Sequence, residues 1–163
     1  MKKLLFLLIL FPMICAGQTV NWFEKDVFFF VSTEIDPRNA IFGSSVNSPA
    51  YDGVLNIGYR NHGFQIQASY ENFKAIEFYS FGFQAGHVFN HGKVWNYTLL
   101  GGLGWIQRNA DWIRNYLYAS ASISGQLEYH YHSFFFFVRG EGRYRHDLDK
   151  FKPSGYAGIG YKF

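Results

Sequence analysis

The feature that most restricts how this chain folds is an alternation of apolar and polar residues with a period of two. Between positions 64 and 71, Phe64, Ile66, Ala68 and Tyr70 alternate with glutamine, serine and glutamate. Such alternation places one kind of side chain on each face of a β-strand. The pattern recurs along the chain without a competing segment of helical periodicity. It predicts strands at residues 26–35, 52–60, 64–73, 77–89, 94–107, 116–130, 134–145 and 155–163.

The connections between these segments alternate between short and long. Residues 61–63 and 90–92 both read Asn-His-Gly, and 131–133 form a third short turn. Asn and Gly adopt the positive φ that tight hairpins require. The expected long connections are 36–51, 108–115 and 146–154, with 74–76 as a short exception. This order is typical of up-and-down barrels with an even strand number, and eight fits.

Periodicity does not decide which face points outward, and a lipocalin-like barrel or a soluble sandwich would bury the apolar face. However, the chain contains 19 Phe and 12 Tyr, too many for the narrow interior of an eight-stranded barrel. Trp95 and Trp105 share one face, and their separation spans roughly 25 Å along a membrane normal at about 40° tilt. We therefore predict an all-β fold, a closed antiparallel up-and-down transmembrane β-barrel of about eight strands.

The N-terminal segment has the features of a secretory leader. Lys2 and Lys3 precede an apolar run at 4–14, and small residues follow at 15–17. This pattern predicts a signal peptide over 1–17, cleaved before Gln18. An uncleaved anchor and a lipoprotein acylated at the single cysteine of this segment are the alternatives. Cleavage leaves a barrel domain over residues 18–163.

The last strand carries a resemblance to a known class. Residues 156–163 read Tyr-Ala-Gly-Ile-Gly-Tyr-Lys-Phe, which resembles the terminal strand of bacterial outer-membrane β-barrels. The chain is similar to the small barrels that include OmpX and the membrane domain of OmpA. The resemblance implies location in a Gram-negative outer membrane. It also implies that the barrel assembly machinery reads Ile159, Tyr161 and Phe163 during insertion.

The polar face collects charged residues of both signs. Buried charges are costly unless they are paired, so we expect a network of salt bridges that fills the lumen. A narrow ion pathway, which would make the protein a small pore, is the alternative. The expected network is Glu34, Arg60, Glu71, Glu128, Arg139, Glu141, Arg143 and Lys162.

Some barrels of this size modify lipid A, and that activity is the alternative enzymatic function. The lipid A deacylase family uses a His-x-Ser pair and a glutamate. Here His130 and His132 flank Tyr131, and Ser133 follows His132 directly, so the motif is not matched. These residues are expected in a solvated turn on the periplasmic side, whereas lipid A lies in the outer leaflet. The palmitoyltransferase family is not matched by a His, Asp and Ser set either. The sequence therefore predicts no catalytic residues.

The remaining expectation is a structural role, or binding and adhesion through the outer loops. Loops on a rigid scaffold are where barrels place binding residues. His146, Asp147 and Asp149 are expected in a solvated loop, and we predict neither a metal site nor a cofactor. With 15 basic against 12 acidic residues, the charge is unlike that of nucleic-acid-binding proteins. The expected partners are outer-membrane lipids, lipopolysaccharide and an extracellular partner of unknown identity. The candidate contacts are Arg38, Phe42, Arg108, Trp112 and Arg114.

Overall fold

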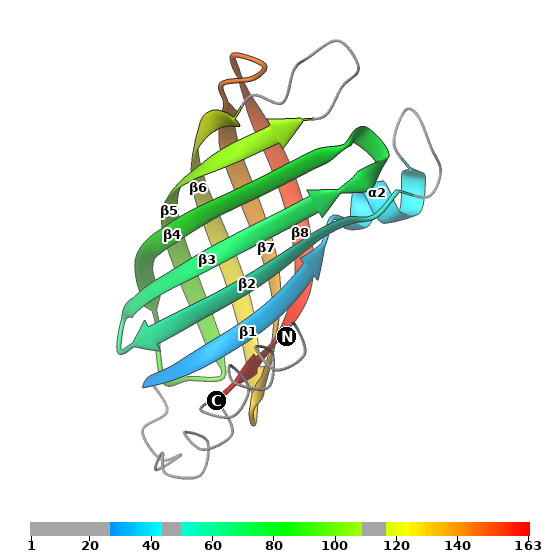
Figure 1. Cartoon of the computed structure of the whole chain (residues 1–163). Helices are drawn as coiled ribbons and strands as arrows, with labels where there is room; N and C mark the ends of the chain where they lie inside the picture. Colours follow the sequence, from blue (N-terminus) through cyan, green and yellow to red (C-terminus); the bar gives the residue numbers. More distant parts are fainter. Residues whose placement is uncertain (1–26, 44–49, 109–116) are drawn as a thin grey trace, which may run out of the picture.

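The computed structural model describes residues 27–43, 50–108 and 117–163. Its eight strands form a closed antiparallel barrel in which neighbours in sequence pair and β8 pairs with β1 (Figure 1). The predicted fold class is therefore confirmed, whereas the signal peptide predicted at 1–17 lies outside the described residues. The strands are β1 (Val27–Ile35), β2 (Asp52–Asn61), β3 (Phe64–Phe73), β4 (Phe78–Phe89), β5 (Trp95–Arg108), β6 (Leu117–Tyr131), β7 (Phe134–Arg145) and β8 (Lys150–Lys162).

Tight connections gather at one end of the barrel, here called the turn end, where β1 begins and β8 finishes (Figure 1). His62, Asn90 and His132 take φ values of 47°, 59° and 52° in these three connections. Positive φ allows a two-residue turn to match the twist of the strands that it joins. The opposite end, here called the loop end, carries the other connections, including the helices α2 (Pro37–Phe42) and η1 (Lys74–Ile76).

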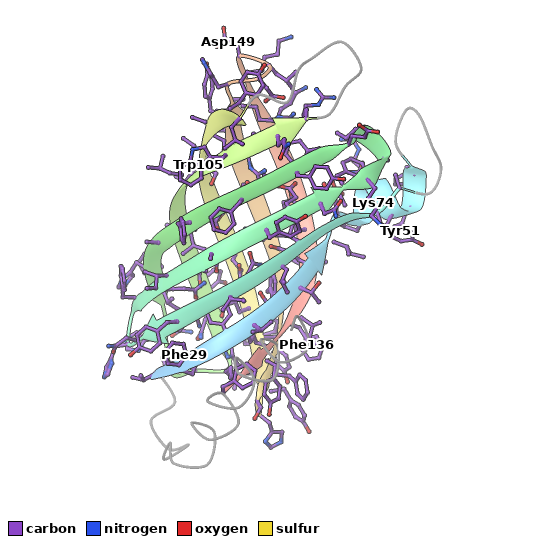
Figure 2. The ribbon with its side chains drawn as sticks, viewed as in Figure 1. Phe29, Tyr51, Lys74, Trp105, Phe136 and Asp149 are labelled. Atoms are coloured by element: carbon purple, nitrogen blue, oxygen red, sulfur yellow. The ribbon has the colours of Figure 1, made fainter. Side chains whose placement is uncertain are left out.

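The two faces of the strands have opposite polarity. On the outer face, Ile57 and Leu103 are 55% and 73% exposed, whereas Gln65 and Glu128 on the inner face are fully buried. Figure 2 places Phe29 on the wall nearer the turn end and Trp105 nearer the loop end. The barrel thus has an apolar outside and a largely polar inside, as predicted, which is the arrangement that suits a hydrocarbon environment.

The strand β8 begins five residues earlier than predicted, which corrects the expected long connection at 146–154. The chain reverses in a short turn at which Asp149 takes a φ of 49°. The ladder between β1 and β8 ends where Ile35 pairs with Ala157, and α2 lies beside the earlier part of β8 instead. Pro153 falls in this part, where the absence of a backbone N–H costs no ladder hydrogen bond.

The helix α2 was not predicted, because six residues are too few to show helical periodicity. Its N-cap is Asp36, whose carboxylate accepts hydrogen bonds from the backbone N–H groups of Arg38 at 2.8 Å and Asn39 at 3.2 Å. Pro37 starts the helix with a pre-set φ, and Gly43 ends it at a φ of 75°. Within the described residues, no helix is long and apolar enough to cross a membrane.

Aromatic rings occupy the inner face at the turn end, which the sequence pattern does not reveal. Phe28, Phe30, Phe135 and Phe137 form one buried cluster, and the rings of Phe30 and Phe135 meet edge to face with centroids 5.6 Å apart. The strands make room for these rings by placing glycines opposite them. The glycines Gly58, Gly158 and Gly160 pair with Phe30, Phe137 and Phe135, respectively.

Candidate functional site in the barrel lumen

The strands bring the predicted charged residues together inside the barrel. Four are basic and four are acidic, so the set carries no net charge. It draws on β1, β2, β3, β6, β7 and β8, because alternate positions of each strand face inward. The eight residues are Glu34, Arg60, Glu71, Glu128, Arg139, Glu141, Arg143 and Lys162.

Glu128 on β6 is the centre of the cluster nearer the turn end. Its Oε1 accepts hydrogen bonds from Arg60 Nη2 at 2.7 Å and Thr98 Oγ1 at 2.6 Å. Glu128 is 0% exposed and Arg60 is 1% exposed, so the two charges are removed from bulk water. Desolvated charges of this kind are tolerated only with full pairing. The pair links β6 with β2, four strands away.

His130 also faces the lumen, which corrects its interpretation as a solvated turn residue. Its Nε2 lies 2.7 Å from Glu128 Oε2, and its Nδ1 lies 3.3 Å from Lys162 Nζ. The ring stacks on Phe135 with centroids 5.5 Å apart. The reason is that β6 continues past His130, so the alternation of faces continues as well. His130 is thus part of the turn-end cluster.

A ladder of glutamines connects this cluster with the rest of the lumen. Gln65 Oε1 accepts from Arg60 Nε at 3.0 Å, and Gln65 Nε2 donates to Gln67 Oε1 at 2.7 Å. Gln67 Nε2 then donates to Gln84 Oε1 at 2.8 Å, and Gln84 Nε2 reaches Glu141 Oε2 at 3.4 Å. A glutamine side chain both donates and accepts, so it can continue a chain of hydrogen bonds between two charged groups.

Two arginines organise the cluster nearer the loop end. Arg139 on β7 lies 2.8 Å from Glu34 Oε1 through Nη2 and 3.2 Å from Glu141 Oε2 through Nη1. Arg143 Nε donates to the other oxygen of Glu141 at 2.6 Å, and Arg143 Nη1 pairs with Glu71. Through these contacts β7 is bound to β1 on one side and reaches β3 across the lumen.

The acidic residues of the β7–β8 turn are occupied by neighbouring side chains. Asp147 Oδ2 accepts from Arg145 Nη2 at 2.6 Å and lies 3.9 Å from Arg108 Nη1. Asp149 accepts a hydrogen bond from the hydroxyl of Tyr144. In the part of the chain that the structure describes, no group of three or more His, Cys, Asp or Glu side chains is arranged to hold a metal ion.

Those of the predicted outer contacts that the structure describes lie at the loop end. Arg38 and Phe42 are exposed on α2, with Phe42 at 78% exposure. Arg108 is the last residue of β5 and is held near Asp147 rather than free in a loop. Trp112 and Arg114 lie outside the described residues.

The predicted assembly signal lies on and just beyond the turn-end part of β8. Ile159 is 39% exposed on the outer face, and the ring of Tyr161 lies 5.1 Å from that of Phe134 and 5.0 Å from that of Phe163. The backbone N–H of Phe163 donates to the carbonyl of Phe29 at 2.8 Å. These contacts place the three residues on the barrel wall, and their role in assembly stays a prediction.

Comparison with known proteins finds similarity at the level of structure. No family model and no curated protein sequence matches the chain. The N-terminal β-barrel domain of Pseudomonas aeruginosa OprF is similar with a TM-score of 0.62 at 18% identity, covering 85% of this chain and 98% of that one. The Yersinia pestis outer membrane protein Ail is similar with a TM-score of 0.56 at 16% identity, covering 85% and 99%. Neisserial surface protein A is similar with a TM-score of 0.55 at 15% identity, covering 84% and 96%. The fold is therefore that of the small eight-stranded outer-membrane barrels.

Proposed function

We propose that this chain is an outer-membrane barrel of a Gram-negative bacterium with a closed lumen, and that it acts as a scaffold for contacts at its loop end. The apolar outer wall and the similarity in fold to outer-membrane barrels support the location. The proposed role is structural, or one of binding and adhesion, rather than transport or catalysis.

The main support for a closed lumen is the set of ion pairs between strands. Arg60 pairs with Glu128 from β2 to β6, and Arg143 pairs with Glu71 from β7 to β3. An eight-stranded barrel is only just wide enough for its own side chains. Charges of opposite sign that meet across so narrow a lumen support the proposal that no water-filled path is left for ions.

The purified protein in planar lipid bilayers is accordingly expected to show no steady conductance. The physical reason is that an ion would have to break buried ion pairs in order to pass. A large porin inserted in the same bilayer serves as the positive control, because porins with 16–18 strands enclose an aqueous channel. Reproducible unitary currents from this protein would contradict the closed lumen and favour the small pore.

The loop end offers a surface for contact on α2. Ile41 and Phe42 are 71% and 78% exposed, and Arg38 on the same helix is exposed as well. Apolar residues next to a cation suit an amphipathic ligand with anionic groups, such as lipopolysaccharide, or an extracellular protein. No residue of α2 is buried, and Ile41 and Phe42 are apolar side chains of this helix that are accessible to a ligand.

Replacing Ile41 and Phe42 with Ser, together with R38Q, is expected to weaken binding of purified lipopolysaccharide about tenfold or more. The estimate follows from the loss of two large apolar contacts and one charge. Binding is measured by titration of the detergent-solubilised protein. K74Q is the matched control, because Lys74 is also an exposed cation at the loop end. Equal affinity of the triple variant and the wild type would remove α2 from the proposed surface.

No specific contact favours the lipid A-modifying alternative. The hydrogen-bond partners of His130 among the described side chains are Glu128, Asn96 and Lys162, none of which is a nucleophilic serine. With the short turns on the periplasmic side, as expected from the sequence, His130 at the turn end lies on the opposite side of the barrel from the outer leaflet. We therefore propose that the protein is not an enzyme.

A further inference from the structure

A cavity of about 330 Å³ opens at the loop end of the lumen, above the ion pairs. Its volume lies at the lower end of the range for small-molecule sites. The inner faces of β2, β3, β7 and β8 supply most of its walls. The residues that line it include Asp52, Glu71, Phe73, Ile76, Arg143 and Lys152.

Asp52 provides an unused acceptor in this cavity. The residue is 6% exposed, and its Oδ1 has no hydrogen-bond partner in the described structure. Burial and the nearby carboxylates of Glu71 and Asp36 disfavour a negative charge on this group, and Glu71 also lies within hydrogen-bonding reach of it, whereas the cation of Arg143 favours the charge. Arg143 is itself engaged by Glu71 and Glu141. A buried acceptor without a donor is unfavourable, and a ligand that carries a cationic donor would satisfy it.

The facing wall provides the opposite charge. Lys152 lies on the inner face of β8, next to Arg143 in the register of β7 and β8. Arg145 is held by Asp147 and lies over the ring of Phe78, whereas no described residue forms an ion pair with Lys152. The ammonium group of a lysine is a mobile point charge on a flexible stem. It is therefore available to an anionic group that enters the cavity.

The cavity also has an apolar side and a closed base. Phe73 and Ile76 line it between β3 and η1. Below them, Glu71 is bound by Arg143 and by the hydroxyl of Tyr156 at 3.1 Å. The cavity is thus a cup with an acidic wall, a basic wall and an apolar patch.

We propose that this cup binds a small zwitterion with an apolar body, of the chemical class of the aliphatic α-amino acids. The ammonium group of the ligand donates to Asp52 Oδ1, its carboxylate pairs with Lys152, and its side chain packs against Phe73 and Ile76. The inference rests on the proposed function in one respect, because the closed lumen makes the cavity a binding site rather than the mouth of a pore.

Calorimetric titration of the full protein purified in detergent tests the proposal with three probes. They are L-leucine, L-leucine methyl ester, which lacks the anion, and 4-methylpentanoate, which lacks the cation. L-leucine is expected to bind, and each of the other two is expected to bind about tenfold more weakly, since each loses one charged hydrogen-bond contact. Equal binding of all three probes, or no binding of L-leucine, would overturn the proposal.

Two variants assign the charges. D52N is expected to weaken binding of L-leucine about tenfold but not that of 4-methylpentanoate, which has no ammonium group. K152Q is expected to weaken binding of L-leucine and not that of the methyl ester. E77Q and K150Q are matched controls, because both residues are exposed at the loop end and neither lines the cavity. Unchanged binding of L-leucine to both D52N and K152Q overturns the assignment.

The same samples separate failure of this inference from failure of the proposed function. Each variant is checked for heat-dependent gel mobility, which reports a folded barrel independently of ligand binding. D52N is expected to be at least as resistant to heat as the wild type, because it replaces a buried carboxylate beside Glu71 and Asp36 with a neutral amide. If the wild-type protein is folded and non-conducting but does not bind L-leucine, the zwitterion site is refuted. The proposal of a closed barrel is not affected by that result.

Discussion

Replacing Glu128 with Ala is expected to lower the free energy of unfolding by about 3–5 kcal/mol, the usual cost of removing one partner from a buried ion pair. The loss is large because Arg60, which is 1% exposed in the barrel, keeps its charge without the carboxylate that offsets its desolvation. Thr98 Oγ1 and His130 lose an acceptor at the same time. Unfolding by urea in detergent micelles, followed by tryptophan fluorescence, measures the change.

Two further variants show whether the effect comes from the unpaired charge. The double variant R60A/E128A is expected to lose less stability than E128A alone, because it buries no unpaired charge. E77A, in which an exposed carboxylate is removed, is expected to stay within about 0.5 kcal/mol of the wild type. If the free energy of unfolding of E128A equals that of E77A, the lumen network does not stabilise the barrel.

The substitution Gly86→Ala is expected to cost about 3 kcal/mol, at the upper end of the range for overpacking. A Cβ at this position would collide with the carbonyl oxygen of Leu99 and lie 2.9 Å from the Cα of Leu100. Both atoms belong to the backbone of β5, which pairs with β4 along its length. The strand has no room to move away without breaking its own ladder. The midpoint of urea unfolding is the measurement.

The matched control for this substitution is Gly140→Ala on β7. A Cβ added at Gly140 would meet no heavy atom within 4 Å, so the change in stability is expected to stay within about 0.5 kcal/mol. Both variants exchange the same two residue types within a strand, and only the surroundings of the new methyl group differ. Equal stability of the two variants would show that the close approach of β4 and β5 at Gly86 is not rigid.

The strands were predictable because the wall of the barrel separates two environments. An apolar exterior and a polar interior impose a period of two on every strand, and the predicted bounds of 64–73 and 134–145 match β3 and β7. The start of β8 was not predictable in this way. The sequence there is typical of a loop, because it contains Lys150, Lys152 and Pro153. In the barrel, however, one side of β8 pairs with no strand at these residues, and an unpaired edge accepts proline.

The inward direction of the charged residues was predictable, but their partners were not. Alternation shows that Arg60 and Glu128 face inward, whereas the contact between them joins residues 68 positions apart. Only the closure of the barrel determines which strands face each other. The glutamine ladder was not predicted, for a similar reason. An uncharged inward residue such as Gln67 can be recognised as a hydrogen-bonding link only when its neighbours on the adjacent strands are known.

The lumen network and the proposed contacts at the loop end both require that the chain is a folded barrel in the outer membrane. The most direct measurement is the gel mobility of the full-length protein in the outer-membrane fraction of a Gram-negative host, compared before and after boiling. The protein is expected in this fraction, and its unboiled band is expected to migrate differently from its boiled band, because the closed ladder of eight strands survives in detergent until heated. Recovery of the protein in the soluble fraction, with one mobility under both conditions, would show that the chain is not an outer-membrane barrel.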